Sequence, residues 1–250
     1  MNVLILGGTT EASALARLLA PDARFQATLS LAGRTRNPLP QPVPCRVGGF
    51  GGADGLAAYL RENRVGALID ATHPFASQMT RNAAEAARQV GTPLVAIVRP
   101  AWQAQPGDRW QIVPDMDSAA RALGPAPRRV FLTVGQKDLA PFVSKPQHRY
   151  LVRSVEPPAA PPPRAVVISA RGPFEEDGER RLLQEHGIEV LVTKNAGGTA
   201  TRAKLDAARA LGIDVVMIAR PGLPPGLDAV PTAAAAMVWL EAQAAVLRGE

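Results

Sequence analysis

The chain has 250 residues, 46% of them hydrophobic and 20% charged, and a formal net charge of +6 at pH 7. This composition is typical of a folded globular protein and excludes a disordered chain, and no apolar run has the length of a membrane span. The single cysteine, Cys45, excludes an internal disulfide, and three scattered histidines give no metal-ligand spacing, so no metal site is expected.

The first hundred residues alternate between apolar runs and amphipathic stretches. Strands are predicted at 2–6, 25–31, 65–70 and 93–98, and helices at 10–20, from 54 onward and from about 77 to 89. Strands that alternate with helices indicate a parallel sheet with crossover connections. Met1 lies almost directly before the first strand and no signal peptide precedes it, so we expect a cytoplasmic protein.

A segment without periodicity, 101–127, is expected to be a connector, and the alternation then begins again. A strand with a glycine turn is predicted at 128–135, further strands at 149–153, 165–169, 189–193 and 214–218, and helices at 137–143, 175–186 and 199–211. We therefore expect an α/β protein with two Rossmann-like parallel-sheet domains that face a central cleft. Its expected parts are a nucleotide-binding domain at 1–100, the connector, a second α/β domain at 128–231 and a C-terminal helix at 232–250.

The turn after the first strand, GGTTEA at 7–12, has the composition of a phosphate-binding turn. Gly7 and Gly8 permit a close approach of backbone N–H groups to a phosphate, and Thr9 and Thr10 add hydroxyl donors before a helix N-terminus. A purely structural turn, with Thr10 as N-cap and Glu11 in the first turn, explains the same residues equally well. The full G-x-G-x-x-G pattern is absent.

The turn after the second strand carries arginine where many dinucleotide folds carry a carboxylate. A carboxylate there binds the ribose 2′-hydroxyl, whereas arginine accommodates a 2′-phosphate. Ser30 and Gly33 lead into Arg34, Thr35 and Arg36. The alternative is that these arginines are simply solvated. The two turns together favour NADPH over NADH, with Arg34 as the first candidate for the 2′-phosphate.

A histidine follows the strand at 65–70, in the sequence DATHPFA. Because a proline comes next, His73 is expected in an extended conformation at the sheet edge, where it can contact a ligand or donate a proton near neutral pH. A structural histidine bonded to loop backbone is the alternative. Asp70 is expected either to orient His73 or to cap the next helix.

Cations also follow the strands of the second half. Lys137, Arg171 and Lys194, with Arg153 and Arg220, are expected to form a basic wall suited to a ligand with several carboxylates. Compositional bias is the alternative explanation of the positive charge. No basic run of the nucleic-acid-binding kind exists. Hydrolase and P-loop motifs are absent as well, whereas hydride transfer needs none of them because the cofactor supplies the reactive atom.

Six motifs in order resemble the precorrin-6A reductase family of cobalamin biosynthesis. They are ILGGTTEA at the start, VGGFGG at 47–52, IDATHPFA at 69–76, VRSVEPP at 152–158, ARGPF at 170–174 and VTKNAGG at 192–198. The resemblance runs from the first strand to about Arg220. It implies a two-domain α/β protein that binds NADPH and reduces one double bond of precorrin-6A, a polycarboxylate tetrapyrrole, to give precorrin-6B.

The resemblance also implies roles for individual residues. The cofactor would be held by Gly7, Gly8, Thr9, Thr10, Glu11, Ser30, Gly33, Arg34, Thr35 and Gly49. The substrate would be held by Arg171, Lys194, Asn195 and Gly198, with His73 and Lys137 as the candidate proton donors. Protonation by solvent or by the carboxyl groups of the substrate is the alternative. We expect no nucleic acid or membrane partner. We do expect a transient handover of the product to neighbouring enzymes of the pathway.

Two alternatives stay open. One is reduction of the cobalt-containing substrate with NADH, and the other is a non-catalytic tetrapyrrole or nucleotide-binding protein of the same fold. An unrelated short-chain dehydrogenase is disfavoured because neither tyrosine, Tyr59 nor Tyr150, is followed four residues later by lysine.

Overall fold

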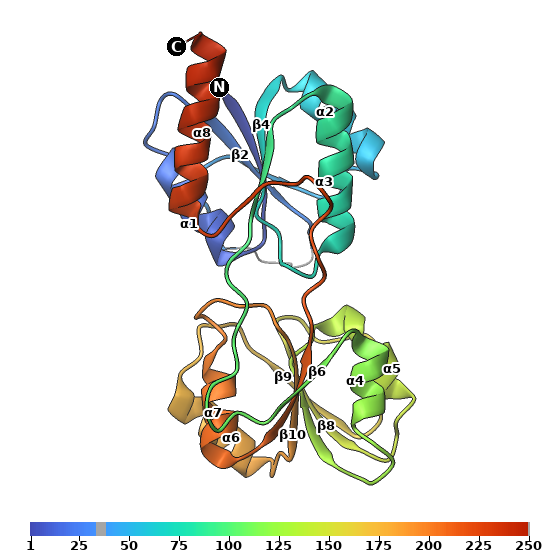
Figure 1. Ribbon diagram of the computed structural model, residues 1–250. Helices are drawn as coiled ribbons and strands as arrows, with labels where there is room; N and C mark the ends of the chain where they lie inside the picture. Colours follow the sequence, from blue (N-terminus) through green and yellow to red (C-terminus); the bar gives the residue numbers. More distant parts are fainter. Residues whose placement is uncertain (34–38, 250) are drawn as a thin grey trace. The chain divides into compact units, whose positions relative to one another are not determined.

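The computed structural model describes residues 1–33 and 39–249. The chain forms two compact units. The first consists of Met1–Pro100 together with Pro221–Glu250, and the second of Ala101–Arg220. Each unit contains its own six-stranded sheet in which every pair of neighbouring strands is parallel. The expected α/β class with two parallel sheets is therefore confirmed (Figure 1).

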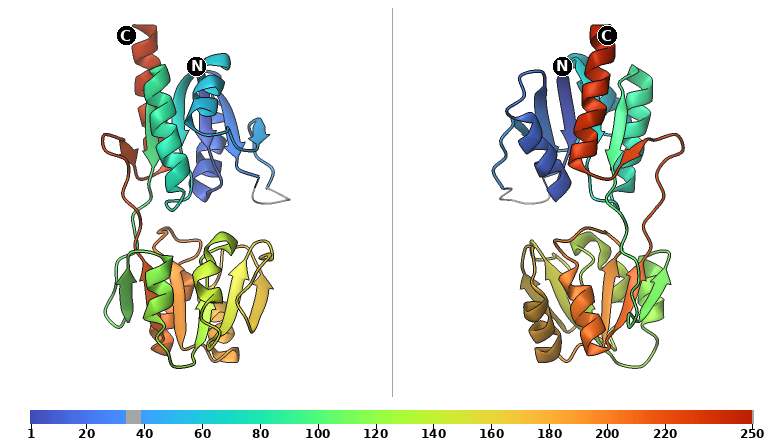
Figure 2. Two further views of the ribbon diagram at one scale, coloured as in Figure 1. Left: turned by 90° about the vertical axis from the view of Figure 1, so that its right-hand side faces the viewer. Right: turned by 60° about the vertical axis from the view of Figure 1, so that its left-hand side comes forward.

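The sheet of the first unit has the order β12-β5-β4-β1-β2-β3. Its strands are β1 (Asn2–Leu6), β2 (Gln26–Leu31), β3 (Cys45–Val47), β4 (Val65–Asp70), β5 (Leu94–Ile97) and β12 (Ala229–Val230). Helices α1 (Thr10–Leu19) and α8 (Ala233–Arg248) cover one face, and α2 (Ala53–Glu62) and α3 (Ser77–Val90) cover the other (Figure 2).

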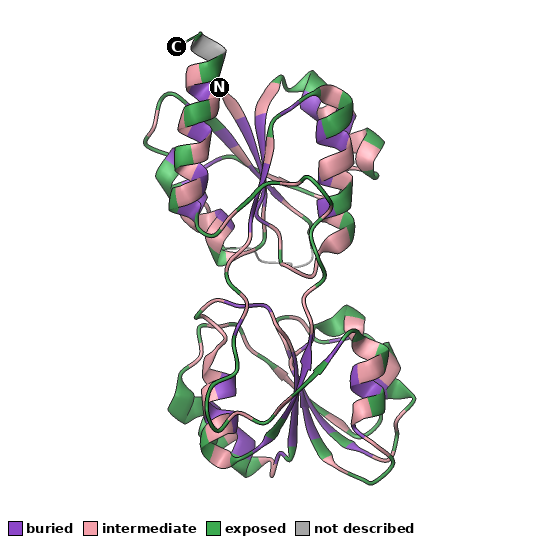
Figure 3. Cartoon of the chain, viewed as in Figure 1, coloured by how far each residue is buried: buried purple, intermediate pink, exposed green. Residues whose placement is uncertain are grey.

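Successive side chains of β1 point to opposite faces of the sheet, and both faces are buried. Val3 and Ile5 pack in the cluster that contains α1 and α8, whereas Leu4 and Leu6 pack in the cluster that contains α2 and α3. All four side chains are at most 2% exposed. A continuous apolar run is the pattern of a strand covered by helices on both sides. Figure 3 shows the buried residues concentrated in the strands and on the inner helix faces.

The sheet of the second unit has the order β6-β11-β10-β7-β8-β9. Its strands are β6 (Trp110–Val113), β7 (Arg129–Leu132), β8 (Arg149–Ser154), β9 (Ala165–Ser169), β10 (Val190–Lys194) and β11 (Asp214–Ile218). Helices α6 (Glu176–Glu185) and α7 (Ala203–Leu211) pack together over one face, and the short helices α4 (Met116–Ala122) and α5 (Ala140–Val143) lie on the other. A 3₁₀ turn, η1 (Gln136–Asp138), precedes α5.

Three segments differ from what the sequence predicts. The expected connector at 101–127 contains β6 and α4, which belong to the second unit. β6 is a four-residue edge strand with two exposed positions, so it carries no periodicity that a sequence pattern can reveal. Residues 221–231, expected to end the second domain, instead belong to the first unit because β12 pairs with β5. The third strand of the first sheet, β3, was not expected at all.

Candidate active site

The carboxyl ends of β1, β2 and β4 lie at one edge of the first sheet. In the parallel register Leu6 is paired with Ser30 on one side and with Asp70 on the other. The turns that follow these three strands therefore leave the sheet at the same level. Ligands of open α/β sheets bind at this edge, and the predicted cofactor residues of the first unit stand in or beside these turns.

The glycine pair after β1 lies directly against β2. The Gly7 N–H donates to the carbonyl oxygen of Ser30 at 2.9 Å, and a Cβ atom at Gly7 would lie 2.5 Å from Leu29 Cδ1. Gly8 has φ +113° and open space where a Cβ atom would stand. Gly7 thus permits the close packing of Leu29, whereas Gly8 gives the backbone a conformation that side chains disfavour and leaves it accessible to a ligand.

Thr9, and not Thr10, is the N-cap of α1. The Thr9 hydroxyl oxygen accepts from the Ala12 N–H at 3.2 Å, and the hydroxyl donates to the Ala71 carbonyl at 2.7 Å, which joins the turn to the end of β4. The Thr10 hydroxyl donates to Glu11 Oε2 at 3.2 Å. The N–H groups of the first helical turn have no acceptor within their own helix and can bind an anion.

Glu11 brings a negative charge to this turn, and Arg99 compensates it. Arg99 Nη1, just after β5, lies 2.7 Å from Glu11 Oε2, and the two side chains are 16% and 20% exposed. An unpaired carboxylate beside an anion site would repel a phosphate. The ion pair removes most of that repulsion and fixes the Glu11 side chain.

Arg46 of β3 joins the end of β2 to the loop after β3. Ser30 is 4% exposed, and its hydroxyl oxygen accepts from Arg46 Nη1 at 2.8 Å. Gly33 has φ +70°, and the Gly49 carbonyl accepts from Arg46 Nη2 at 3.1 Å. Arg34 and Thr35, the expected 2′-phosphate region, and Arg36 after them, lie outside the described residues.

His73 is an exposed residue just beyond β4. Its Nδ1 accepts from the Phe75 N–H at 3.2 Å, so the neutral ring carries its proton on Nε2, and its ring centroid lies 5.8 Å from that of Phe75. Asp70 is buried and accepts from both the N–H and the hydroxyl of Thr72, at 3.0 and 2.7 Å. Asp70 thus shapes the turn that presents His73.

The candidate residues of the second unit also stand at or after strand ends. Lys194 closes β10, and its Nζ lies 2.6 Å from Oδ2 of Asp138 in η1. Lys137, in the same 3₁₀ turn, and Arg171, after β9, are exposed. The structure therefore brings these cations to the carboxyl-end edge of the second sheet, as the sequence predicts for a parallel fold.

Asn195 uses its side chain to hold the segment that enters the second unit. Its Oδ1 accepts from the Trp102 N–H at 2.8 Å, and its Nδ2 donates to the Trp102 carbonyl at 3.0 Å. The Trp102 indole N–H in turn donates to the Gly198 carbonyl at 2.7 Å. The segment that leaves the unit is held by the same loop, because Arg220 Nη2 donates to the Ala196 carbonyl at 3.0 Å.

Arg153 differs from the expectation of a basic wall. Both of its terminal nitrogens contact the carboxylate of Glu179 in α6, and both side chains are buried. The guanidinium carbon lies 3.8 Å from the ring centroid of Phe174 and 4.9 Å from that of Phe131. Arg153 is thus a structural residue that fixes the segment after Arg171. The sequence alone did not predict this ion pair, because Glu179 lies on another element.

Neither a metal centre nor a membrane span is found where the structure describes the chain. No three residues among its histidines, cysteines, aspartates and glutamates are grouped to hold a metal ion. Every described helix is too short or too polar to cross a bilayer.

A family model described as "Precorrin-6x reductase CbiJ/CobK" matches residues 2–241. The chain belongs to this family. A precorrin-6A reductase from Rhodococcus erythropolis is 50% identical over 240 residues, 96% of this chain and 97% of the relative. One from Rhodobacter capsulatus is 50% identical over 252 residues, 99% of each. The solved structure of CobK precorrin-6A reductase has a TM-score of 0.92 and 49% identity, and covers 97% of both chains. The resemblance seen in the motifs is confirmed.

In this precorrin-6x reductase family member, the predicted site residues fall into two groups. The described cofactor candidates and His73 lie at the carboxyl-end edge of the first sheet, and the substrate candidates and Lys137 lie at that of the second. Sequence reasoning missed Arg46, which contacts two of the predicted cofactor residues, Ser30 and Gly49. The available signal was an arginine just before the VGGFGG motif.

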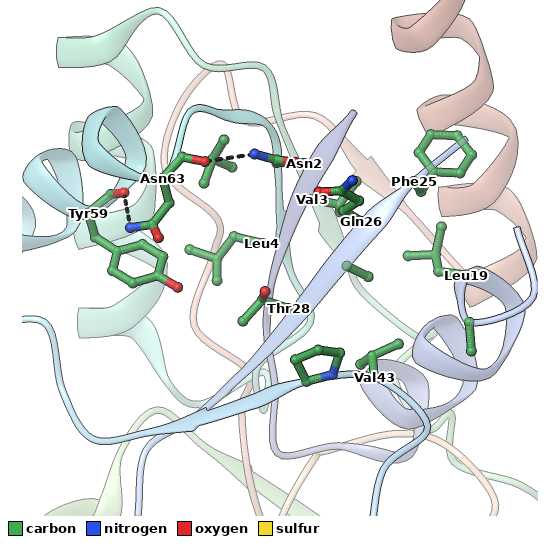
Figure 4. Close-up of a pocket in the computed structure, with 14 residues that line it drawn as sticks. Asn2, Val3, Leu4, Leu19, Phe25, Gln26, Thr28, Val43, Tyr59 and Asn63 are labelled. Carbon is green, nitrogen blue, oxygen red and sulfur yellow. Dashed lines mark hydrogen bonds between the residues drawn. The ribbon is translucent and has the colours of Figure 1, made fainter. Parts of the chain in front are cut away.

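A pocket of about 470 Å³ in the first unit lies away from these turns (Figure 4). Its lining includes Asn2, Gln26 and Val65, which begin β1, β2 and β4. It also includes Tyr59 and Asn63 from the end of α2. The pocket is thus at the amino ends of the strands, opposite to the edge where a family member of this fold is expected to bind its nucleotide.

Proposed function

We propose that this protein is an NADPH-dependent precorrin-6A reductase that reduces one double bond of the macrocycle to give precorrin-6B. Family membership supports the reaction. The observation that carries the cofactor assignment is the turn at 7–11, where two glycines, a capped helix N-terminus and the end of β2 meet at one sheet edge. Reduction of a double bond requires a hydride donor, and this turn suits the pyrophosphate of a nicotinamide cofactor.

The first unit holds the cofactor in this proposal. The backbone N–H groups from Gly8 to Glu11 bind the pyrophosphate, and the Arg99–Glu11 ion pair keeps that region free of net negative charge. Arg34 and Thr35 contribute to the ribose end. NADPH supplies the hydride, and a proton is added to the neighbouring carbon.

The second unit holds the substrate. Precorrin-6A carries several acetate and propionate groups, and Arg171 and Lys194 are suited to bind carboxylates. Asp138 orients the Lys194 ammonium. Asn195 and Gly198 act through the shape of their loop, because their polar groups are bonded to Trp102. The proton comes from His73 or Lys137, or, if neither variant loses turnover by more than a few-fold, from solvent or the carboxyl groups of the substrate.

The proposed function is tested by mixing the purified protein with NADPH and metal-free precorrin-6A while following absorbance at 340 nm and the macrocycle spectrum. We expect NADPH oxidation coupled to a new chromophore. Turnover only with cobalt-precorrin-6A would show that the cobalt-containing compound is the substrate. Binding of NADPH without its oxidation in the presence of either compound would indicate a carrier. His73→Ala and Lys137→Ala in the same assay identify the proton donor, which should lose more than about tenfold in turnover.

A further inference from the structure

Arg46 lies beside the end of β2, where dinucleotide-binding sheets meet the adenosine ribose. β3 pairs with β2 in the register Leu29 with Cys45, Ser30 with Arg46, and Leu31 with Val47. Arg46 is therefore the direct neighbour of Ser30. In folds of this kind the residues at this point distinguish a ribose 2′-hydroxyl from a 2′-phosphate.

The Arg46 guanidinium is held in one orientation by five groups. Nη1 donates to Ser30 Oγ at 2.8 Å and to the Gly48 carbonyl at 3.0 Å, and Nη2 donates to the Gly49 carbonyl at 3.1 Å. Its central carbon lies 3.8 Å from the ring centroid of Phe50 and 5.2 Å from that of Tyr59. An arginine that is already ordered loses little side-chain entropy when an anion binds.

In this geometry Arg46 keeps two N–H donors and its positive charge available to bind a ligand. An arginine has five N–H donors. The bonds to Ser30, Gly48 and Gly49 use three, which leaves the Nε–H and one Nη2–H without an acceptor among the described residues. All of its bonding partners are neutral, and no carboxylate in residues 1–33 or 39–249 forms an ion pair with it.

Among the described residues, two other arginines near strand ends are, unlike Arg46, paired with carboxylates. Arg99 is paired with Glu11, and Arg153 with Glu179, so their charge is used within the protein. Arg46 is only partly exposed, and its Nη2 bond lies on the exposed side, whereas the Nη1 bonds are partly buried. A preoriented cation with two remaining donors and no carboxylate partner is suited to a dianionic phosphate.

We propose that Arg46 binds the 2′-phosphate of NADPH and thereby selects NADPH over NADH. The inference rests on the proposed function, because it assigns a residue to the cofactor site of that reaction. Arg46 has a second effect on the same site, since its bonds to Gly48 and Gly49 hold the glycine loop at 48–52 against the end of β2.

Binding of NADPH and NADH is measured by fluorescence titration, without substrate. Arg46→Ala should raise the Kd for NADPH by about 10- to 100-fold more than the Kd for NADH, since loss of the charge-assisted contact affects only NADPH whereas a shift of the glycine loop affects both. Arg46→Lys should recover part of the NADPH affinity because it keeps the charge. Arg61→Ala, which removes an exposed arginine on α2, is the matched control and should bind both nucleotides as the parent does.

An equal loss of affinity for both nucleotides would show that Arg46 only maintains the shape of the glycine loop, and it would overturn the proposal. Unchanged NADPH binding would overturn it as well, and Arg34→Ala and Arg36→Ala, titrated in parallel, would then show which arginine selects the phosphate. A parent protein that binds neither nucleotide would refute the proposed function itself, together with this inference. Titration with 2′,5′-ADP and 5′-ADP provides a second comparison that isolates the phosphate from the nicotinamide end.

Discussion

At the scale of single residues, His148 shows how burial controls a protonation state in the second unit. Its side chain is fully buried, and Nδ1 accepts from the Arg128 N–H at 3.2 Å. The neutral ring therefore carries its proton on Nε2, which has no hydrogen-bond partner among the described residues. Burial is the largest effect and lowers the pKa of His148. The Gly124 backbone opposes it with the next largest effect, and the positive charges of Arg128 and Lys145 lower the pKa further.

This lowered pKa predicts a loss of stability in mild acid. The unfolded chain binds a proton at His148 near pH 6.5, whereas the folded protein binds it only at lower pH. The stabilisation is thus complete above pH 6.5 and is lost as the pH falls through the folded-state pKa. We expect the urea midpoint to drop between pH 7.5 and pH 5 by more in the parent protein than in His148→Gln. Equal drops in the two proteins would remove His148 as the cause.

The charged residues at strand ends illustrate what sequence could and could not predict about the site. Their positions follow from strand order alone, so Lys137, Arg171 and Lys194 were located correctly at a sheet edge. Their partners come from other elements. Glu179 is 26 residues from Arg153, and Glu11 is 88 from Arg99. No local pattern distinguishes a paired arginine from one that is available to a ligand.

At the scale of elements, the contact between α2 and the loop before it depends on Gly55. A Cβ atom at Gly55 would lie 1.7 Å from the carbonyl oxygen of Phe50, a backbone atom that cannot move without moving the loop. The loop itself contains Gly48, Gly51 and Gly52 at φ +122°, +80° and +102°. The VGGFGG motif therefore encodes a loop that packs directly on the first turn of α2 and brings Phe50 under Arg46.

Gly55→Ala should destabilise the protein by roughly 1–3 kcal/mol, because the helix and the loop are forced apart. Gly178→Ala is the matched control. Gly178 also lies inside a helix, α6, but its Cβ atom would meet open space, so alanine should stabilise by about 0.5–1 kcal/mol. Chemical denaturation of both variants measures the two effects. A neutral Gly55→Ala would mean that the loop at 48–52 is free to shift away from α2.

The elements that sequence predicted and those it missed differ in length and position. Central strands such as β1, β4 and β10 are apolar and five or six residues long, so their pattern is visible. The missed strands, β3, β6 and β12, have three, four and two residues, and each is an edge strand of its sheet. Their strand conformation comes from pairing with a neighbour, which no local window contains.

At the scale of the whole molecule, the chain leaves the first unit after Pro100 and returns to it at Pro221. The returning segment completes the first sheet through β12 and covers one of its faces with α8. Ala236 and Leu240 of α8 are fully buried in the same cluster as Val3 and Ile5 of β1. The core of the first unit is thus made from both ends of the sequence, whereas the second unit is continuous.

This arrangement predicts that the two units differ in their ability to fold as fragments. A fragment of residues 101–220 contains all six strands and all covering helices of its unit, so it should give an α/β circular dichroism spectrum and a cooperative thermal transition. A fragment of residues 1–100 should not unfold cooperatively, because without α8 the apolar face around Val3 and Ile5 is exposed to water.

The control for this prediction is a first unit in which Pro100 is joined to Pro221 by a flexible glycine-serine linker. It restores β12 and α8, and it should recover cooperative unfolding that residues 1–100 lack. Leu240→Ala in the joined unit should then cost about 2–5 kcal/mol, as expected for a fully buried leucine. Cooperative folding of residues 1–100 alone would show that α8 is dispensable, and the burial of Ala236 and Leu240 would then contribute little to the core of the first unit.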